Sequence, residues 1–145
     1  MSLRRKSREL ALQCLYQMDQ SGNRECTIED MNVNFDVNAK AVSYAQELIS
    51  GIQHHLGEVD DVIEKHAKNW RLSRMTVIDR NLLRIATYEF LYKSDIPGSV
   101  IIDEAIEIAK RYSTDDAASF INGILDPICR VTENKRQNNV EGAAG

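Results

Sequence analysis

The sequence VIDRNLLRIATYEFLY, residues 77–92, gives the clearest indication of the fold. On a helix its apolar residues cover most of the circumference instead of one stripe; they are Val77, Ile78, Leu82, Leu83, Ile85, Ala86, Phe90 and Leu91. Such a helix is normally central and covered by its neighbours. The sequence SDIPG at 94–98 is a turn that no helix can cross. We therefore expect a helical protein with residues 77–92 at its centre.

Helical spacing of apolar residues continues on both sides of this segment. It predicts helices at about 7–20, 40–56, 59–69 and 99–111, a short one near 27–32, and a last one capped by Ser113 or Thr114. In the last helix we expect Gly123 to leave room for a neighbouring helix, and Pro127 to kink or end the helix. Strand-like alternation of useful length is absent from the sequence. The predicted fold class is all-α, with about seven helices.

A break in the pattern divides the chain near its middle. The sequence NWRLS at 69–73 is typical of a connector, so we place a boundary between an N-terminal half, 9–70, and a C-terminal half, 71–133. Residues 1–8 are predicted to be a basic arm leading into the first helix, and the polar residues 134–145 a disordered tail.

Composition narrows the class of protein. The chain has 145 residues, of which 43% are hydrophobic, which fits a folded protein of one or two small domains. No apolar run reaches the roughly 18 residues that a membrane span needs, and we expect neither an anchor nor a secretory signal. Cys14, Cys26 and Cys129 show no CxxC spacing, so reduced, buried thiols are expected. The predicted location is cytoplasmic.

Charge is distributed unevenly along the chain. The net charge is −4, yet the first eight residues carry +4 from Arg4, Arg5, Lys6 and Arg8. Positive charge at the start of a helix opposes the helix dipole, and an anionic ligand would relieve that conflict. Four cations together can neutralise phosphates and release counterions. The arm is therefore a candidate RNA-binding element, unless it is merely basic and solvated.

Motifs for catalysis are missing from the sequence. Neither GxGxxG nor GxxxxGK[ST] occurs, and no serine or cysteine carries the signature of an activated nucleophile. His54 and His55 point about 100° apart on a helix, and no zinc spacing completes them. We expect no enzyme, no catalytic residues, no metal and no cofactor.

Three stretches together resemble the NusB family of bacterial transcription antitermination factors. They are RRKSRELALQCLYQMD at 4–19, LLRIATYEFLY at 82–92 and IPGSVIIDEAIEIAKRYSTDDAASFINGILD at 96–126. Residues 21–72 fit the family by pattern more than by motif. The resemblance implies two small helical bundles packed side by side. It also implies binding of the boxA segment of ribosomal RNA leader transcripts together with NusE, a small-subunit ribosomal protein, in a complex on RNA polymerase.

The same resemblance implies which residues contact RNA. The family's arginine-rich arm matches Arg4, Arg5, Lys6 and Arg8, with Lys6 lacking the bidentate geometry of an arginine. Its RNA face matches Gln13 and Tyr16 in the first helix, and Asp116 and Phe120 near the start of the last. Each residue has a structural alternative. Tyr16 could be a half-buried core tyrosine, which its spacing alone favours. Phe120 could be a core aromatic, and Asp116 could serve only the helix dipole.

Contacts with NusE are implied for the central helix. Asp79 matches an acidic contact of the family, and Arg80 and Arg84 are expected one turn apart on its exposed side. Both arginines could instead form ion pairs within the chain, which is the favoured interpretation for Arg84. An apolar face kept for NusE would also allow two copies to pair as a homodimer.

Two other functions remain open from the sequence. Domains resembling NusB also form the N-terminal part of ribosomal RNA cytosine methyltransferases, which need a following cofactor domain. A helical module that binds only proteins would leave the basic arm without a role.

Overall fold

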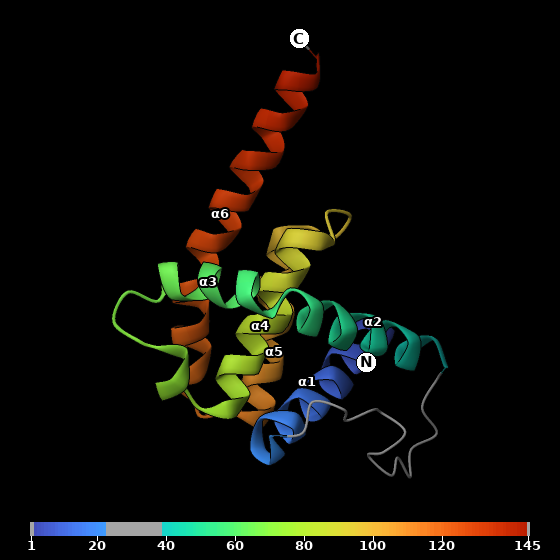
Figure 1. Ribbon diagram of the computed structural model, residues 1–145, viewed down its shortest axis with the longest axis vertical. Helices are drawn as coiled ribbons and strands as arrows, with labels where there is room; N and C mark the ends of the chain where they lie inside the picture. The colour runs from blue at the N-terminus through green and yellow to red at the C-terminus, as the bar shows by residue number, and fades with distance from the viewer. Residues whose placement is uncertain (1, 23–38, 145) are drawn as a thin grey trace.

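The structure, a computed structural model, describes residues 2–22 and 39–144 and is built from helices (Figure 1). The elements are α1 (Leu3–Ser21), α2 (Ala39–His54), α3 (Leu56–His66), the 3₁₀ turn η2 (Leu72–Arg74), α4 (Val77–Tyr92), α5 (Gly98–Tyr112) and α6 (Ala117–Ala144). The described part of the chain contains no strand. The prediction of an all-α fold is confirmed. The short helix predicted near 27–32 lies outside the described residues.

The central position predicted for α4 is confirmed. It packs against α1, α2, α3, α5 and α6, and its bounds are those read from the sequence. The side chain of Thr76 caps its start by accepting a hydrogen bond of 3.1 Å from the backbone N–H of Asp79. Leu82, Leu83 and Phe90 are almost wholly buried. This helix therefore holds the faces of all its neighbours in place.

A single cluster of buried side chains runs through both halves of the chain. It joins Leu10 and Leu15 of α1 to Leu83 of α4 and to Ile121 and Leu125 of α6. The connector between α3 and α4 lies where the sequence places it, with η2 inside it. The boundary near residue 70 thus divides the chain but not the core.

The last helix differs from its prediction at both ends. It begins at Ala117, so Asp115 and Asp116 precede it instead of forming its first turn. It continues past Pro127 to Ala144, and its final turns project away from the other helices (Figure 1). Burial of Ile124 and Ile128 on either side of the proline holds the helix together there. Residues 134–144, for which the sequence predicts a disordered tail, continue α6 in the structure, and Lys135, Arg136 and Gln137 among them are good helix formers.

Close helix packing occurs at a different glycine from the expected one. A Cβ added at Gly123 would meet no atom within 4 Å, so this residue makes no room for a neighbour. A Cβ at Gly51 would instead lie 2.2 Å from the Cζ atom of Tyr88. The glycine in α2 is the one that lets α4 approach.

Candidate nucleic-acid interface

The cationic N-terminus is the first part of α1, not an arm in front of it. Ser2 caps the helix, because its hydroxyl oxygen accepts a hydrogen bond of 3.1 Å from the backbone N–H of Arg5. The helix therefore begins at Leu3, four residues before the predicted start, and no acidic residue lies in its first turn. The conflict between positive charge and the helix dipole is present in the fold.

The two arginines of this turn, Arg4 and Arg5, differ in how readily their guanidinium groups can reach a ligand. Arg4 is exposed, with its guanidinium carbon 3.9 Å from the centre of the Tyr44 ring. Arg5 donates to both carboxylate oxygens of Glu104 in α5, at 2.7 Å from Nε and 3.1 Å from a terminal nitrogen. These hydrogen bonds raise the pKa of Arg5. Arg4 can meet a phosphate directly, whereas Arg5 must first leave Glu104; Lys6 is partly exposed.

Arg8 does not fit its predicted role. Only 3% of it is exposed, and it donates to both carboxylate oxygens of Glu89 at 2.8 and 2.9 Å. The hydroxyl of Tyr44 donates to the same carboxylate at 2.6 Å, and burial beside Glu89 raises the pKa of Tyr44. The prediction that Arg8 belongs to the RNA-binding cations is corrected: its charge is used inside the protein.

A shallow apolar groove lies along the outer side of α1. It has a volume of about 470 Å³ and is lined by Glu9, Leu12, Gln13, Tyr16, Gln17, Ile78 and Tyr112. Tyr16 is 42% exposed, so it is half-buried, as its structural alternative expects, and the rest of its ring is open to the groove. Gln13 is partly exposed beside it. A flat ring and an amide at an open groove can stack on a base and hydrogen-bond its edge.

The second predicted pair of RNA contacts lies at the start of α6. Asp116 is exposed just before the helix, and Phe120 is partly buried against the core. Phe120 also meets Trp70 of the connector edge to face, with ring centres 5.9 Å apart. Both readings of Phe120 thus apply, since one part of its ring packs inward and another lies near the surface.

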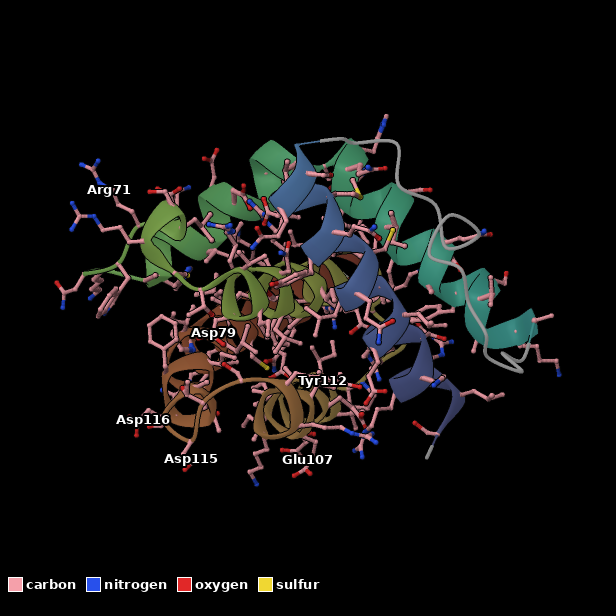
Figure 2. All side chains as sticks on the ribbon, turned by 90° about the horizontal axis from the view of Figure 1, so that it is seen from below. Arg71, Asp79, Glu107, Tyr112, Asp115 and Asp116 are labelled. Atoms are coloured by element: carbon pink, nitrogen blue, oxygen red, sulfur yellow. The ribbon has the colours of Figure 1, made fainter. Side chains whose placement is uncertain are left out.

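These two parts of the predicted site share one face of the molecule. Figure 2 shows Tyr112, Asp79 and Asp116 on the same side, viewed from below the bundle. The groove includes Tyr112 and Ile78, and the hydroxyl of Ser113 donates to Asp79 at 2.7 Å. The end of α5 and the start of α4 therefore bridge α1 to α6. Along α1, Arg4 and Tyr16 are separated by about 18 Å at ~1.5 Å per residue.

The residues predicted to contact a protein partner are largely enclosed. Asp79 is only 7% exposed. Arg80 donates to Asp19 at 3.0 Å and to the carbonyl oxygen of Leu72 at 3.1 Å. Arg84 donates to both carboxylate oxygens of Asp60, at 2.9 and 3.1 Å. The expectation that both arginines lie on an exposed side is wrong, and the alternative of ion pairs within the chain describes them.

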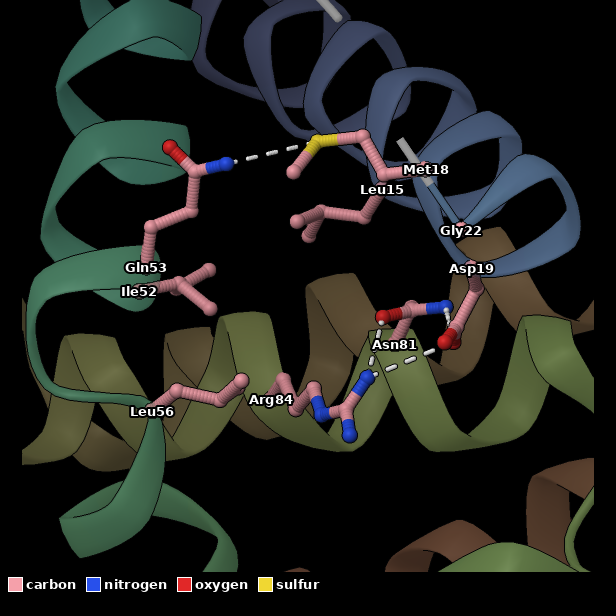
Figure 3. A pocket seen from close by; sticks show the side chains of 9 residues that line it. All are labelled: Leu15, Met18, Asp19, Gly22, Ile52, Gln53, Leu56, Asn81 and Arg84. Atoms are coloured by element: carbon pink, nitrogen blue, oxygen red, sulfur yellow. Dashed lines mark hydrogen bonds and ion pairs between the residues drawn. The ribbon is translucent and has the colours of Figure 1, made fainter. Parts of the chain in front are cut away.

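Asp19 is the hub of this charged cluster. It accepts from Arg80, from Arg84 at 3.3 Å and from the side-chain amide of Asn81 at 2.9 Å. Partial burial alone would raise the pKa of Asp19, but the Asn81 hydrogen bond and the two arginine charges together lower it. Figure 3 shows Asp19, Asn81 and Arg84 converging beside a pocket of about 530 Å³, whose lining also includes Met18 of α1 and Leu56 of α3. The cluster ties α1 to α3 and α4.

Two exposed aromatic residues on the predicted RNA face were not identified from the sequence. Tyr112 follows the apolar spacing of α5 and is expected to be buried, yet it is 38% exposed in the groove. Trp70 is 54% exposed in the connector. An unpaired aromatic in a connector is the only signal in the sequence that could have identified Trp70.

Two further features are absent from the part of the chain that the structure describes. Among residues 2–22 and 39–144, no group of three or more His, Cys, Asp or Glu side chains could hold a metal ion. In the same part of the chain, no helix has the length and apolar character to cross a membrane.

Comparisons with known proteins agree with the resemblance found in the sequence. The model of the NusB family matches residues 5–130. The transcription antitermination protein NusB of Geobacter sp. (strain M21) is 42% identical over 144 residues, covering 93% of this chain and 99% of that protein. The similarity therefore extends over nearly the whole length of an antitermination protein.

Solved structures show the same fold. NusB of T. maritima superposes with a TM-score of 0.80 at 41% identity, covering 88% of this chain and 90% of its own. A complex described as antitermination factors NusB and NusE with dsRNA contains a chain at TM-score 0.75 and 30% identity, covering 90% of this chain and 98% of that one.

Proposed function

We propose that this chain, which belongs to the NusB family of transcription antitermination proteins, binds boxA-type single-stranded RNA together with NusE. The RNA would come from ribosomal RNA leader transcripts, and the assembly would join the antitermination complex on RNA polymerase in the cytoplasm. The protein itself is non-enzymatic, and its contribution is recognition.

The observation that carries this proposal is the exposed side of α1. It begins with Arg4, in a first turn that contains no acidic residue, continues past Arg5 and Lys6, and ends in the open groove beside Gln13 and Tyr16. Cations supply phosphate affinity, and an exposed aromatic ring supplies a stacking surface. Asp116 and Phe120 extend the same face, with Asp116 placed to accept from a base amino group. The structural relative described with NusE and dsRNA supports NusE and RNA as partners, and the exposed ring of Tyr16 supports binding of a single strand.

Binding to NusE would strengthen RNA binding. Joint contacts by two linked proteins add affinity without a second association cost. The excess of negative charge outside the first turns would attract a basic ribosomal protein. Asp79, Arg80 and Arg84 would act on this partner by holding the surface of α4 in shape, because their own polar groups are already engaged. In the absence of NusE, an apolar face kept for that partner would allow homodimers.

The test is a salt series of RNA binding with a charge-matched control. Labelled boxA-type RNA is titrated with three proteins: the wild-type chain, Arg4→Gln/Arg5→Gln and Arg130→Gln/Lys135→Gln. Each titration is repeated in the presence of NusE. The first pair lies on the proposed interface; the second removes equal charge from exposed positions of α6. Each lost phosphate contact with a single strand lowers the log–log salt slope by about 0.7, so the first double variant should lose about 1.4.

The outcomes separate the candidate functions. A reduced slope and affinity in the α1 variant alone supports the proposal. If the α1 and α6 variants change the salt slope and the RNA affinity equally, the RNA binds at a surface other than the exposed side of α1. Absence of RNA binding even with NusE would favour a module that binds only proteins.

A further inference from the structure

Trp70 is a large apolar side chain that the fold leaves in solvent. It is 54% exposed, more than any other large hydrophobic side chain among the described residues. Its only ring partner in that part of the chain is Phe120, at 5.9 Å between centres and 80° between planes. An edge-to-face contact leaves the broad faces of the indole without that partner. Trp70 is not among the residues of the core cluster, and its exposed faces are open to a ligand.

The backbone holds this indole in a fixed place. The backbone N–H of Trp70 donates to the carbonyl oxygen of Ala67 at 3.0 Å. Ala67 and Leu72, on either side, are 6% and 5% exposed and belong to the core. The connector is therefore anchored before and after Trp70. A side chain presented in this way loses little conformational entropy when a ligand covers it.

Free positive charge surrounds the same position. Lys68, Arg71 and Arg74 are exposed, and within residues 2–22 and 39–144 none of them forms an ion pair. The next arginines along the chain, Arg80 and Arg84, are both paired with carboxylates. Figure 2 shows Arg71 on the side of the molecule that also carries Asp79 and Asp116.

We propose that Trp70 stacks on a base of single-stranded RNA and that Arg71 and Arg74 bind the phosphates beside it. This surface, the connector site, extends the interface proposed above beyond Phe120 and rests on that proposed function. Phe120 gives the two surfaces physical continuity, because it contacts Trp70 and belongs to the predicted RNA face. An aromatic ring with flanking arginines is the usual combination for binding single strands.

Charge fixes the path of the strand at this end of the face. Asp115 and Asp116 are exposed at the start of α6 and repel phosphates. The sugar–phosphate chain must therefore run on the connector side, over Arg71 and Arg74, with its bases turned towards Trp70 and Phe120. A base amino group would then face Asp116, which can only accept when ionised. Stacking supplies affinity here, and Asp116 supplies preference among bases.

The single tryptophan of the chain allows a direct test. Labelled boxA-type RNA is titrated by fluorescence anisotropy in the presence of a tryptophan-free NusE, while tryptophan emission is recorded in parallel. Stacking predicts that emission changes with the same midpoint as anisotropy. Trp70→Ala should weaken RNA binding about 5- to 150-fold, the range for losing one stacked base, and Trp70→Phe should restore much of it. Arg71→Gln/Arg74→Gln should lower the salt slope by about 1.4.

Two controls make the result specific. Tyr92 is also an exposed aromatic, at 40%, but it lies at the far end of α4, so Tyr92→Ala should leave RNA affinity unchanged. Binding of the Trp70→Ala variant to NusE alone should equal that of the wild type. Circular dichroism checks that each variant is folded.

Distinct results would overturn distinct claims. If the wild type binds RNA without a change in its tryptophan emission, and Trp70→Ala binds RNA equally well, the connector site is wrong and the proposed function stands. If Trp70→Ala loses NusE instead of RNA, the exposed indole belongs to a protein interface. If the wild type binds no RNA even with NusE, the proposed function fails and the connector site fails with it.

Discussion

Arg8 and Glu89 form a buried, doubly hydrogen-bonded ion pair that joins α1 to the central helix. The two residues are 81 positions apart in the sequence, and only 3% and 1% of them is exposed. The Tyr44 hydroxyl completes the carboxylate's hydrogen bonds from α2. Since α1 carries the proposed RNA face, this pair determines where that face lies relative to α4.

Removing one member of the pair should destabilise the protein strongly. In Arg8→Ala the Glu89 carboxylate stays buried without its cation, which typically costs about 3–5 kcal/mol. Glu89→Ala should cost a similar amount. Urea unfolding followed by circular dichroism measures the change in the free energy of unfolding.

A double replacement provides the control for this loss. Arg8→Met/Glu89→Leu keeps similar volume without charge and should recover much of the stability, because a buried ion pair seldom exceeds good apolar packing. Single variants within about 1 kcal/mol of the wild type would show that water reaches the pair and that it is not truly buried.

Glu104 should restrain RNA binding by occupying Arg5. Glu104→Gln removes the charge that holds the guanidinium at 2.7 Å, so Arg5 becomes available to a phosphate. We expect tighter RNA binding, because Arg5 no longer has to leave Glu104, and a salt slope equal to that of the wild type, because the number of phosphate contacts is unchanged; both are measured by anisotropy in a salt series. Glu107→Gln is the matched control, because it removes the same charge from α5 without touching Arg5's hydrogen bonds. Equal effects of the two variants would mean that only net charge matters.

The fold was predictable where periodicity and local signals agree. The bounds of α4 match because Thr76 caps its start and its apolar residues mark the helix throughout. The start of α1 was missed because Arg4, Arg5 and Lys6 carry no apolar periodicity, whereas Ser2, which caps them, lies before the pattern begins. Local sequence determines that a helix forms, but the exact start of α1 and of α4 depends on a single capping side chain, Ser2 or Thr76.

The site was only partly predictable, because exposure depends on partners far away in sequence. Arg8 has the same local features as Arg4 and Arg5, and only its meeting with Glu89 removes it from the surface. Arg80 and Arg84 are likewise enclosed by Asp19 and Asp60, which belong to other helices. Hydrophobic periodicity predicts which face of a helix is buried. It does not predict which charged side chains a neighbouring helix places against that helix.

Two glycine substitutions should change stability in opposite directions. Gly123→Ala places a methyl group in open space on α6, and should stabilise the protein by about 0.5–1 kcal/mol because alanine favours the helix. Gly51→Ala places it 2.2 Å from the Cζ atom of the buried Tyr88, and should destabilise by about 1–3 kcal/mol through overpacking. Thermal unfolding of the two variants, compared with the wild type, measures both effects. A stabilising Gly51→Ala would mean that α2 and α4 can move apart without cost.

Acid should weaken the cluster around Asp19 in a defined pH range. The pKa of Asp19 is lowered in the folded protein, while the unfolded chain keeps a value near the ordinary 3.8. The unfolded state therefore binds a proton first as the pH falls, so the contribution of Asp19 is complete above that value and is lost as the pH drops through the folded pKa. The difference in unfolding free energy between the wild type and Asp19→Asn should stay constant from about pH 7 to 5 and shrink below about pH 4. Asp61→Asn removes an exposed carboxylate and should show no such change. A wild-type advantage that persists unchanged at about pH 2 would mean that Asp19 acts through shape and hydrogen bonding, not through its charge on Arg80 and Arg84.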